Sequence, residues 1–202
     1  MEALAEEEGF FTYAEYKEWE LEAGERYELI YGEAFAMAGP SEQHQAILGG
    51  LFNQFYNYLE GKPCKVYPAP FDVRLFYQED ESDDTVVQPD ILIVCEGKKI
   101  GPESCRGAPD LVVEILSPSN SAMEMEQKFE LYRKAGVREY WVVDPERNRL
   151  KVYYFHDGSI STNTYGSTDK VPVAIFPDLN VVLDKVFTAV IPGVTGRSHL
   201  NK

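Results

Sequence analysis

Two acidic residues lie inside apolar, strand-like segments of the sequence. Asp90 stands in VVQPDILIV, and Glu114 stands in PDLVVEILSP. An unpaired charge in a buried strand costs several kcal/mol, so such a residue needs a partner or a cation. Lys128 follows on the next predicted helix. Asp and Glu oxygens are ligands for Mg²⁺, and a lysine can orient an attacking hydroxide or stabilise transition-state charge. The trio therefore predicts a metal-dependent phosphodiesterase centre.

Both carboxylates are expected at a strand end. Strand side chains alternate between faces, so Glu114 points the same way as Val112 and Leu116. Pro118 cannot continue a central strand, which indicates that the strand ends at a cleft shortly after Glu114. Pro89 lacks an N–H and immediately precedes Asp90, so a bulge or a strand entry is expected there.

Lys128 belongs to a helix predicted over residues 121–135. Ser121 and Glu124 form a capping-box pattern, and Gly136 is the expected stop. At about 100° per residue, Lys128 lies roughly 60° from the centre of the inward stripe, whereas the other charged side chains project outside it. The lysine is therefore expected to reach toward the strand that carries Glu114. The stripe consists of Ala122, Met125, Phe129 and Tyr132.

Two further residues are candidates for the site, and each has a plainer interpretation. His44 falls near the centre of the apolar face of a helix predicted over 41–60, so it is either a catalytic or substrate-binding group or a hydrogen-bonded core histidine. Glu33 follows a turn at Gly32 and could complete a ligand set, although exposed hairpin glutamates are common. For Asp90, Glu114 and Lys128 the alternative is a buried structural ion-pair network.

The elements that must position these residues predict an α/β fold, a mixed sheet flanked by helices. We expect one domain over residues 1–190 and a frayed tail over 191–202. An acidic, solvated loop is expected over 78–84. Helices are predicted over 12–23, 41–60 and 121–135, and strands over 26–39 (two, turning at Gly32), 64–68, 71–76, 86–94, 111–116, 139–145 and 150–155, with short strands up to Phe187.

Composition restricts the class of protein. A chain of 202 residues with 44% hydrophobic and 13% aromatic content is typical of a folded globular domain. No apolar run reaches the roughly 18 residues that span a bilayer. Three cysteines without CxxC spacing predict reduced thiols and a cytoplasmic location. The net charge of −15 argues against tight binding of a bare monomer to nucleic acid.

Several segments together resemble the Uma2 family of endonucleases, within the PD-(D/E)xK nuclease superfamily. They are YELIYGEAF, the helix that begins SEQHQ, QPDILIV, PDLVVEILSPS, KFELYRKAGV, EYWVVDP and FPDLNVVLDKVF, and they extend over almost the whole chain. The resemblance implies a restriction-endonuclease-like α/β fold and a DNA substrate. It also implies Mg²⁺, with Mn²⁺ as an alternative, held by Asp90, Glu114 and the carbonyl of Ile115.

The chain departs from the superfamily pattern two residues after Glu114, where Leu116 replaces the usual lysine. The resemblance and the helix-face argument both assign the lysine role to Lys128. Three hypotheses follow: an Mg²⁺-dependent endonuclease, a non-catalytic binding protein on the nuclease fold, and a hydrolase of small phosphodiesters. A homodimer is expected only by analogy with relatives of the fold.

Overall fold

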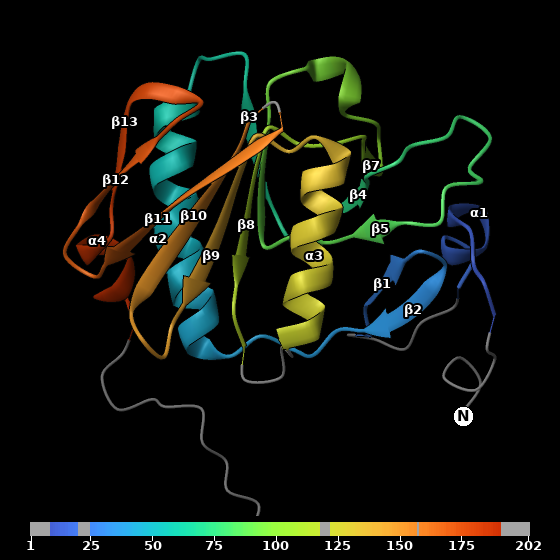
Figure 1. Cartoon of the computed structure of the whole chain (residues 1–202), viewed down its shortest axis with the longest axis horizontal. Coiled ribbons are helices and arrows are strands. Elements are labelled where there is room, and N and C mark those ends of the chain that lie inside the picture. Colours follow the sequence, from blue (N-terminus) through green and yellow to red (C-terminus); the bar gives the residue numbers. More distant parts are fainter. Residues whose placement is uncertain (1–8, 20–24, 118–121, 157, 191–202) are drawn as a thin grey trace, which may run out of the picture.

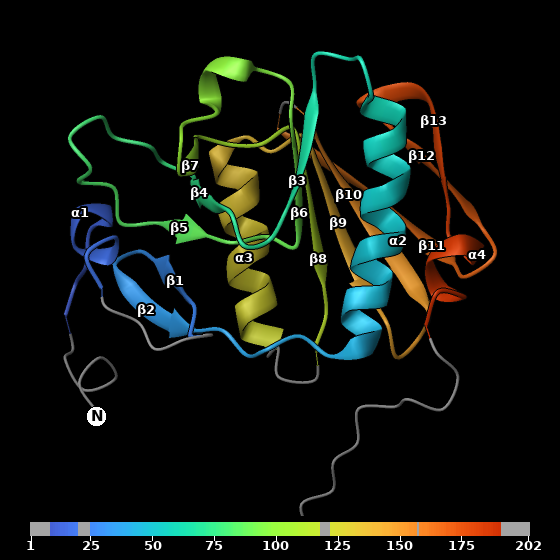
Figure 2. The ribbon, with the colours of Figure 1, turned by 180° about the vertical axis from the view of Figure 1, so that it is seen from behind.

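Strand alternation divides the core into two apolar clusters, one on each face of the central sheet. The computed structural model describes residues 9–19, 25–117, 122–156 and 158–190. In β8 (Leu111–Ile115), Leu111, Val113 and Ile115 pack in the cluster of helix α2 (Glu42–Leu59). Val112 packs in the cluster of helix α3 (Ala122–Ala135). The two helices thus cover opposite faces of the sheet, with α3 in front in Figure 1 and α2 in front in Figure 2.

The central sheet has six strands in the order β11-β10-β9-β8-β6-β3. Only the β8–β9 pair is parallel, because α3 connects these two strands. The sheet is therefore mixed and flanked by helices, as predicted. Its other strands are β3 (Lys65–Pro68), β6 (Ile91–Val94), β9 (Glu139–Asp144), β10 (Arg149–His156) and β11 (Ser159–Gly166).

A second sheet of five strands shares the apolar cluster of α3. Its order is β2-β1-β5-β4-β7, and Ile30, Val73 and Val87 from it pack with Leu131 and Tyr132 of α3. Figure 1 shows α3 between the two sheets. The strands are β1 (Tyr27–Ile30), β2 (Glu33–Ala36), β4 (Asp72–Arg74), β5 (Val86–Val87) and β7 (Ser104–Arg106).

The strand predicted over 86–94 is two strands that belong to different sheets. The chain leaves β5 at Gln88, whose N–H donates to the Glu28 carboxylate at 2.8 Å. Pro89 has no N–H for a ladder, and the chain enters β6 after Asp90. Asp90 therefore lies at the crossing from one sheet to the other.

Both ends of the chain differ from the prediction. Helix α1 (Tyr13–Tyr16) stops well before residue 23, because Trp19 turns back to pack against Phe11 and Tyr27. Residues 184–187 form helix α4 (Asp184–Phe187) and not a strand. Gly50 lets α4 approach α2 closely, since a Cβ there would lie 3.1 Å from Val186 Cα. Strands β12 (Lys170–Val173) and β13 (Phe176–Val182) precede α4, and a 3-10 turn η1 (Gly97–Lys99) was not predicted.

The cysteines correct one expectation. Cys64 and Cys95 form a disulfide, so the prediction of reduced thiols is wrong for both. Antiparallel pairing of Lys65 with Val94 brings the two cysteines opposite each other, although 31 residues separate them in sequence. Cys105 is free and buried. Within the described ranges, no helix is long and apolar enough to cross a membrane. The predicted tail over 191–202 and the predicted cap Ser121 lie outside the described residues.

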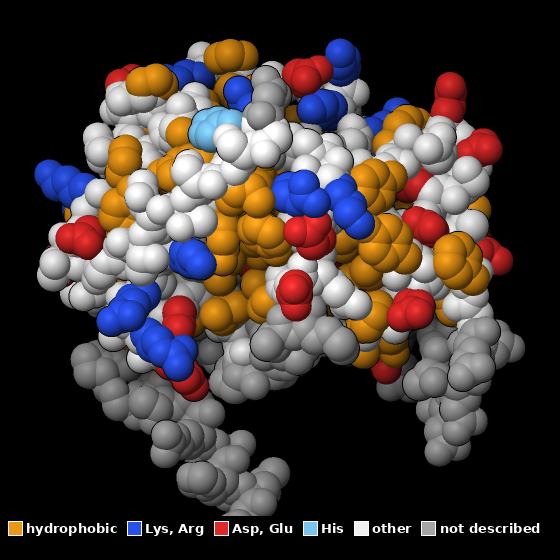
Figure 3. Space-filling model, viewed as in Figure 1, with side chains coloured by type: hydrophobic (Ala, Val, Ile, Leu, Met, Phe, Trp, Pro, Cys, Tyr) orange, Lys and Arg blue, Asp and Glu red, His pale blue; other side chains and the backbone are white. Residues whose placement is uncertain are grey.

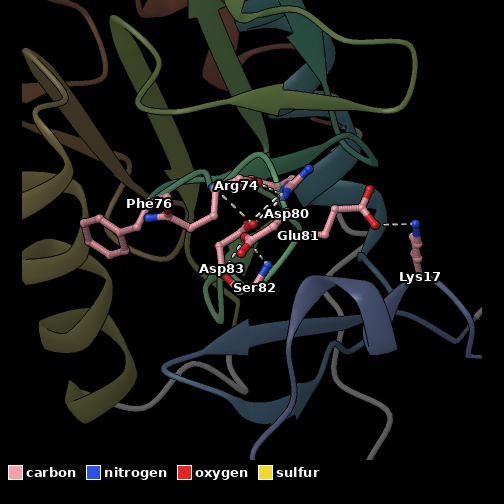
Figure 4. Close-up of polar contacts among 8 residues, drawn as sticks. Lys17, Arg74, Phe76, Asp80, Glu81, Ser82 and Asp83 are labelled. Carbon is pink, nitrogen blue, oxygen red and sulfur yellow. Dashed lines mark hydrogen bonds and ion pairs between the residues drawn. The ribbon is translucent and has the colours of Figure 1, made fainter.

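The acidic loop over 78–84 is only partly solvated. Asp83 is buried, and its carboxylate accepts two hydrogen bonds from the Arg74 guanidinium. Arg74 Nε donates at 2.9 Å, and Nη2 donates through a shorter contact. Glu81 pairs with Lys17 at the exposed side of the loop (Figure 4). The guanidinium also stacks 3.9 Å over the ring of Tyr13. An ion pair therefore anchors a segment whose composition predicted only solvent exposure.

Candidate active site

Lys128 joins two carboxylates that come from different sheets. Its Nζ lies 3.1 Å from Glu114 Oε1 on β8 and 2.9 Å from Glu28 Oε2 on β1. All three side chains are at least nine-tenths buried. The prediction that Lys128 reaches toward Glu114 is confirmed, and Met125, Phe129 and Tyr132 form the expected inward stripe.

A tyrosine fixes the orientation of the Glu114 carboxylate. The Tyr132 hydroxyl, one helical turn after Lys128, donates to Glu114 Oε1 at 2.6 Å. Both donors to this carboxylate, Lys128 and Tyr132, therefore bind the same oxygen. Among the described residues no donor binds Oε2, so this oxygen keeps its lone pairs for a ligand.

Asp90 contacts residues of two other elements, β8 and α2. Its Oδ2 accepts the Ile115 backbone N–H at 2.7 Å, and its Oδ1 lies 3.2 Å from His44 Nε2. His44 is held at the start of α2, where its N–H donates to the capping Ser41 hydroxyl at 3.2 Å. The Nδ1 of His44 is buried and has no partner in the part of the chain that the structure describes.

These groups line one cavity of about 220 Å³. It lies where the carboxyl end of β8 meets the first turns of α2 and α3, in the lower part of Figure 1. Its wall combines acidic, basic and apolar side chains. The charged and titratable members are Arg26, Glu28, His44, Asp90, Glu114, Glu124 and Lys128, and the segment from Phe35 to Pro40 closes one side.

Negative charge is in excess in this cavity. Four carboxylates line it, and among the described residues of its wall only Lys128 and Arg26 are permanent cations. Burial, together with the Asp90 and Glu28 carboxylates, raises the pKa of Glu114 to about 7 even though Lys128 opposes the shift. Burial alone would lower the pKa of Lys128, but Glu114 and Glu28 outweigh it and raise that pKa, so the lysine stays charged.

The structure brings together most of the predicted site residues. Asp90, Glu114, Ile115, Lys128 and His44 all line the cavity. Glu33 does not: it is exposed at the start of β2, opposite Ile30, and is absent from the wall.

Sequence reasoning missed Glu28, Tyr132 and Arg26. Glu28 carried the same signal as the other acids, since it interrupts the apolar run of β1. Tyr132 was assigned to packing alone, because its hydroxyl partner lies on another element. The side chain of Arg26 faces the cavity and has no ion pair with any described residue.

The Asp90 and Glu114 side chains carry carboxylate oxygens, the ligand atoms that hard cations prefer. Across the described residues, no group of three or more His, Cys, Asp and Glu is arranged to hold a metal ion. Zinc needs three or four such side chains, whereas Mg²⁺ binds through one or two carboxylates and keeps several waters. Asp90 and Glu114 with a backbone carbonyl therefore fit Mg²⁺ better than zinc.

The mixed sheet, the flanking helices and the acid-lined cavity define an α/β protein with a restriction-endonuclease-like fold. Over residues 13–184 the chain matches the family model Uma2, described as "Putative restriction endonuclease", and it belongs to this family. A crystal structure described as a "putative nuclease belonging to DUF820" from Anabaena variabilis ATCC 29413 has the same fold. Its TM-score is 0.71 at 20% identity, over 90% of this chain and 99% of that one.

Two proteins of Synechocystis sp. (strain ATCC 27184 / PCC 6803 / Kazusa) are similar in sequence. Uncharacterized protein slr1290 is 27% identical over 159 residues, which is 78% of this chain and 81% of that protein. Uncharacterized protein sll1609 is 30% identical over 145 residues, 70% of this chain and 79% of that protein. Both likenesses extend over more than two thirds of this chain.

Proposed function

We propose that this protein is an Mg²⁺-dependent endonuclease that hydrolyses phosphodiester bonds in DNA. The observation that carries the proposal is an excess of carboxylates in a buried cavity, where burial and the nearby Asp90 and Glu28 carboxylates raise the pKa of Glu114 to about 7. A divalent cation between Asp90 and Glu114 would relieve that excess. The family description and the nuclease described for the structural relative support the same reaction class.

The metal would be held by Asp90, Glu114 and the Ile115 carbonyl, with Mn²⁺ as an alternative ion. The chemistry that the ion supplies when bound is neutralisation of phosphate charge and activation of water. Glu114 offers Oε2, because Lys128 and Tyr132 already bind Oε1. Asp90 is held in place by the Ile115 N–H, and its oxygens retain further lone pairs for a ligand.

Lys128 and His44 would serve the reaction in different ways. Lys128 is fixed between Glu28 and Glu114 and remains protonated, so it supplies a permanent positive charge beside the phosphate. His44 is oriented by Asp90 through Nε2 and lines the cavity, where its imidazole would transfer a proton. Glu28 would position Lys128 and so act on the reaction indirectly.

The test is calorimetric titration with Mg²⁺ and Mn²⁺, paired with cleavage of single-stranded, duplex and branched DNA. Glu114→Gln and Asp90→Asn should abolish both the heat of metal binding and the cleavage. The matched control is Glu139→Gln, because Glu139 is an equally buried strand carboxylate that bonds Trp141 and the Ile175 N–H and does not line the cavity. This variant should retain both activities.

Other outcomes would reject the proposal in distinct ways. Cleavage undiminished in both Glu114→Gln and Asp90→Asn would remove these residues from the site. Absence of metal heat at millimolar concentration would make the carboxylates structural and favour a non-catalytic binding protein. Turnover of bis(p-nitrophenyl) phosphate without cleavage of any DNA would indicate a hydrolase of small phosphodiesters. The net charge of −15 disfavours binding of such a small substrate less than it disfavours binding of DNA.

A further inference from the structure

Strand β11 is a long open edge of the central sheet. It has eight residues, Ser159–Gly166, and along its whole length it pairs with β10 on one side only. Ser159 to Thr164 are all exposed. An edge strand of this kind presents a row of unpaired N–H and C=O groups, which is a template for another strand.

The sequence of β11 lacks the residues that usually block such pairing. SISTNTYG contains neither a charged residue nor a proline. In the described part of the chain, each of the other edge strands contains at least one. They are β2 with Glu33, β3 with Lys65 and Pro68, β7 with Arg106, β12 with Lys170 and Pro172, and β13 with Pro177 and Asp178. The opposite edge of the same sheet, β3, is also only half as long.

The charge of the molecule indicates which partner this edge fits. In a chain with net charge −15, most surfaces of two copies repel each other. The surface along β11 is mainly uncharged, and in Figure 3 it is a pale band on the left half of the molecule. Two antiparallel copies of one strand are related by a two-fold axis, so the residue on the axis faces its own copy and the residues on either side of it face each other. An uncharged strand can pair with its own copy in this way, because no like charges are brought together across the axis.

We propose that two copies of this chain associate through β11, antiparallel and edge to edge, to form one continuous sheet across a homodimer. The two-fold axis passes through Thr162 or Asn163, the two residues at the middle of the strand. Backbone hydrogen bonds supply the attraction, and the exposed Ile160 adds apolar contact. The proposal does not depend on the reaction, because the catalytic candidates lie on β1, β8, α2 and α3 and immediately before β6.

The first test is the oligomeric state, measured by sedimentation over a concentration series. Wild type should shift from monomer to dimer as concentration rises. Thr162→Lys should stay monomeric, because a lysine on an edge strand blocks pairing and here would lie at or next to the axis, close to its own copy. Asn57→Lys, on the exposed face of α2, is the matched control and should dimerise as wild type does. Thermal unfolding confirms that both variants are folded.

The second test fixes the geometry. Thr162→Cys and Asn163→Cys are made separately, and the cysteine that lies on the axis should form a disulfide-linked dimer on mild oxidation, whereas Asn57→Cys should not. The native cysteines do not interfere, since Cys105 is buried and Cys64 and Cys95 are bonded to each other. A wild type that is monomeric at every concentration overturns the proposal. So does a dimer that persists in Thr162→Lys, or one that neither mid-strand cysteine cross-links.

Discussion

Buried charges occur in two regions of this molecule, at the Arg74–Asp83 pair and at the cavity around Glu114. Arg74 and Asp83 match one cation with one carboxylate in a two-point contact, and the Gln78 carbonyl accepts a further bond from the guanidinium. Neither residue lines the cavity. At Glu114, the ammonium of Lys128 contacts two carboxylates, Glu28 and Glu114, and a third carboxylate, Asp90, lines the same cavity.

The difference separates a structural ion pair from a candidate active site. A balanced, fully bonded pair needs nothing further, so its role is to anchor the loop shown in Figure 4. An unbalanced group of carboxylates is unfavourable unless a cation or a proton joins it. Strong perturbation of a carboxyl in a cavity is therefore the better indication of function, and burial alone is the weaker one.

The largest effect is expected on the free energy of unfolding, when the balanced Arg74–Asp83 pair is broken. Asp83→Asn leaves the Arg74 guanidinium buried without a counter-charge, so it should lower the free energy of unfolding by about 3–5 kcal/mol. Glu114→Gln removes one of several carboxylates, and its amide oxygen can still accept from Tyr132. At pH 8 this variant should be at least as stable as wild type.

Urea denaturation of both variants under metal-free conditions measures the contrast. Equal losses in Asp83→Asn and Glu114→Gln would mean that the Glu114 group is also a balanced structural network. The comparison would then no longer distinguish the two regions.

Sequence patterns predicted one of these regions and not the other. Asp90, Glu114 and Lys128 were visible because each breaks a local periodicity, in a strand or on a helix face. Asp83 was not, since it lies among six other polar residues and its partner is on a different strand. The Cys64–Cys95 disulfide was hidden for the same reason, because it depends on the register of β3 with β6. Local patterns thus predict single residues, whereas pairings across elements require the fold.

The second prediction concerns pH. The pKa of Glu114 is raised from 4.5 to about 7, so the folded protein binds this proton more tightly than the unfolded chain does. The resulting stability is fully present below about pH 4.5 and is lost as the pH rises through about 7. Glu114→Gln should not show this loss of stability. When Mg²⁺ is added above pH 7, the free energy of unfolding of the wild type should rise toward that of the variant.

Unfolding free energies between pH 4.5 and 8 measure this effect. The control is Glu139→Gln, which should retain the loss of stability that Glu114 causes. It should lack only the contribution of Glu139 itself, whose pKa is also raised by burial. The affinity for Mg²⁺ should also increase through pH 7, because the carboxyl must lose its proton before it binds the ion. A metal affinity that is flat from pH 6 to 8 would contradict Glu114 as a ligand.

The smallest expected effect distinguishes two neighbouring tyrosines of the same core. The Tyr132 hydroxyl donates to Glu114, whereas the Tyr140 hydroxyl is buried and has no partner among the described residues. Their rings lie 5.0 Å apart. Tyr132→Phe should cost about 1.5–3 kcal/mol, the range for a hydrogen bond to a charged group. Tyr140→Phe removes an unsatisfied polar atom and should be neutral or stabilising.

The pH dependence of Mg²⁺ binding distinguishes the hydrogen bond of Tyr132 from its packing, because loss of packing alone would not change that dependence. The bond from Tyr132 lowers the pKa of Glu114, so Tyr132→Phe should shift the onset of Mg²⁺ binding to higher pH. Tyr140→Phe should leave that onset unchanged, because its hydroxyl donates to no carboxylate in the described structure. If both variants shift the onset equally, burial alone sets the pKa of Glu114. The hydrogen bond from Tyr132 would then have no specific effect on metal binding.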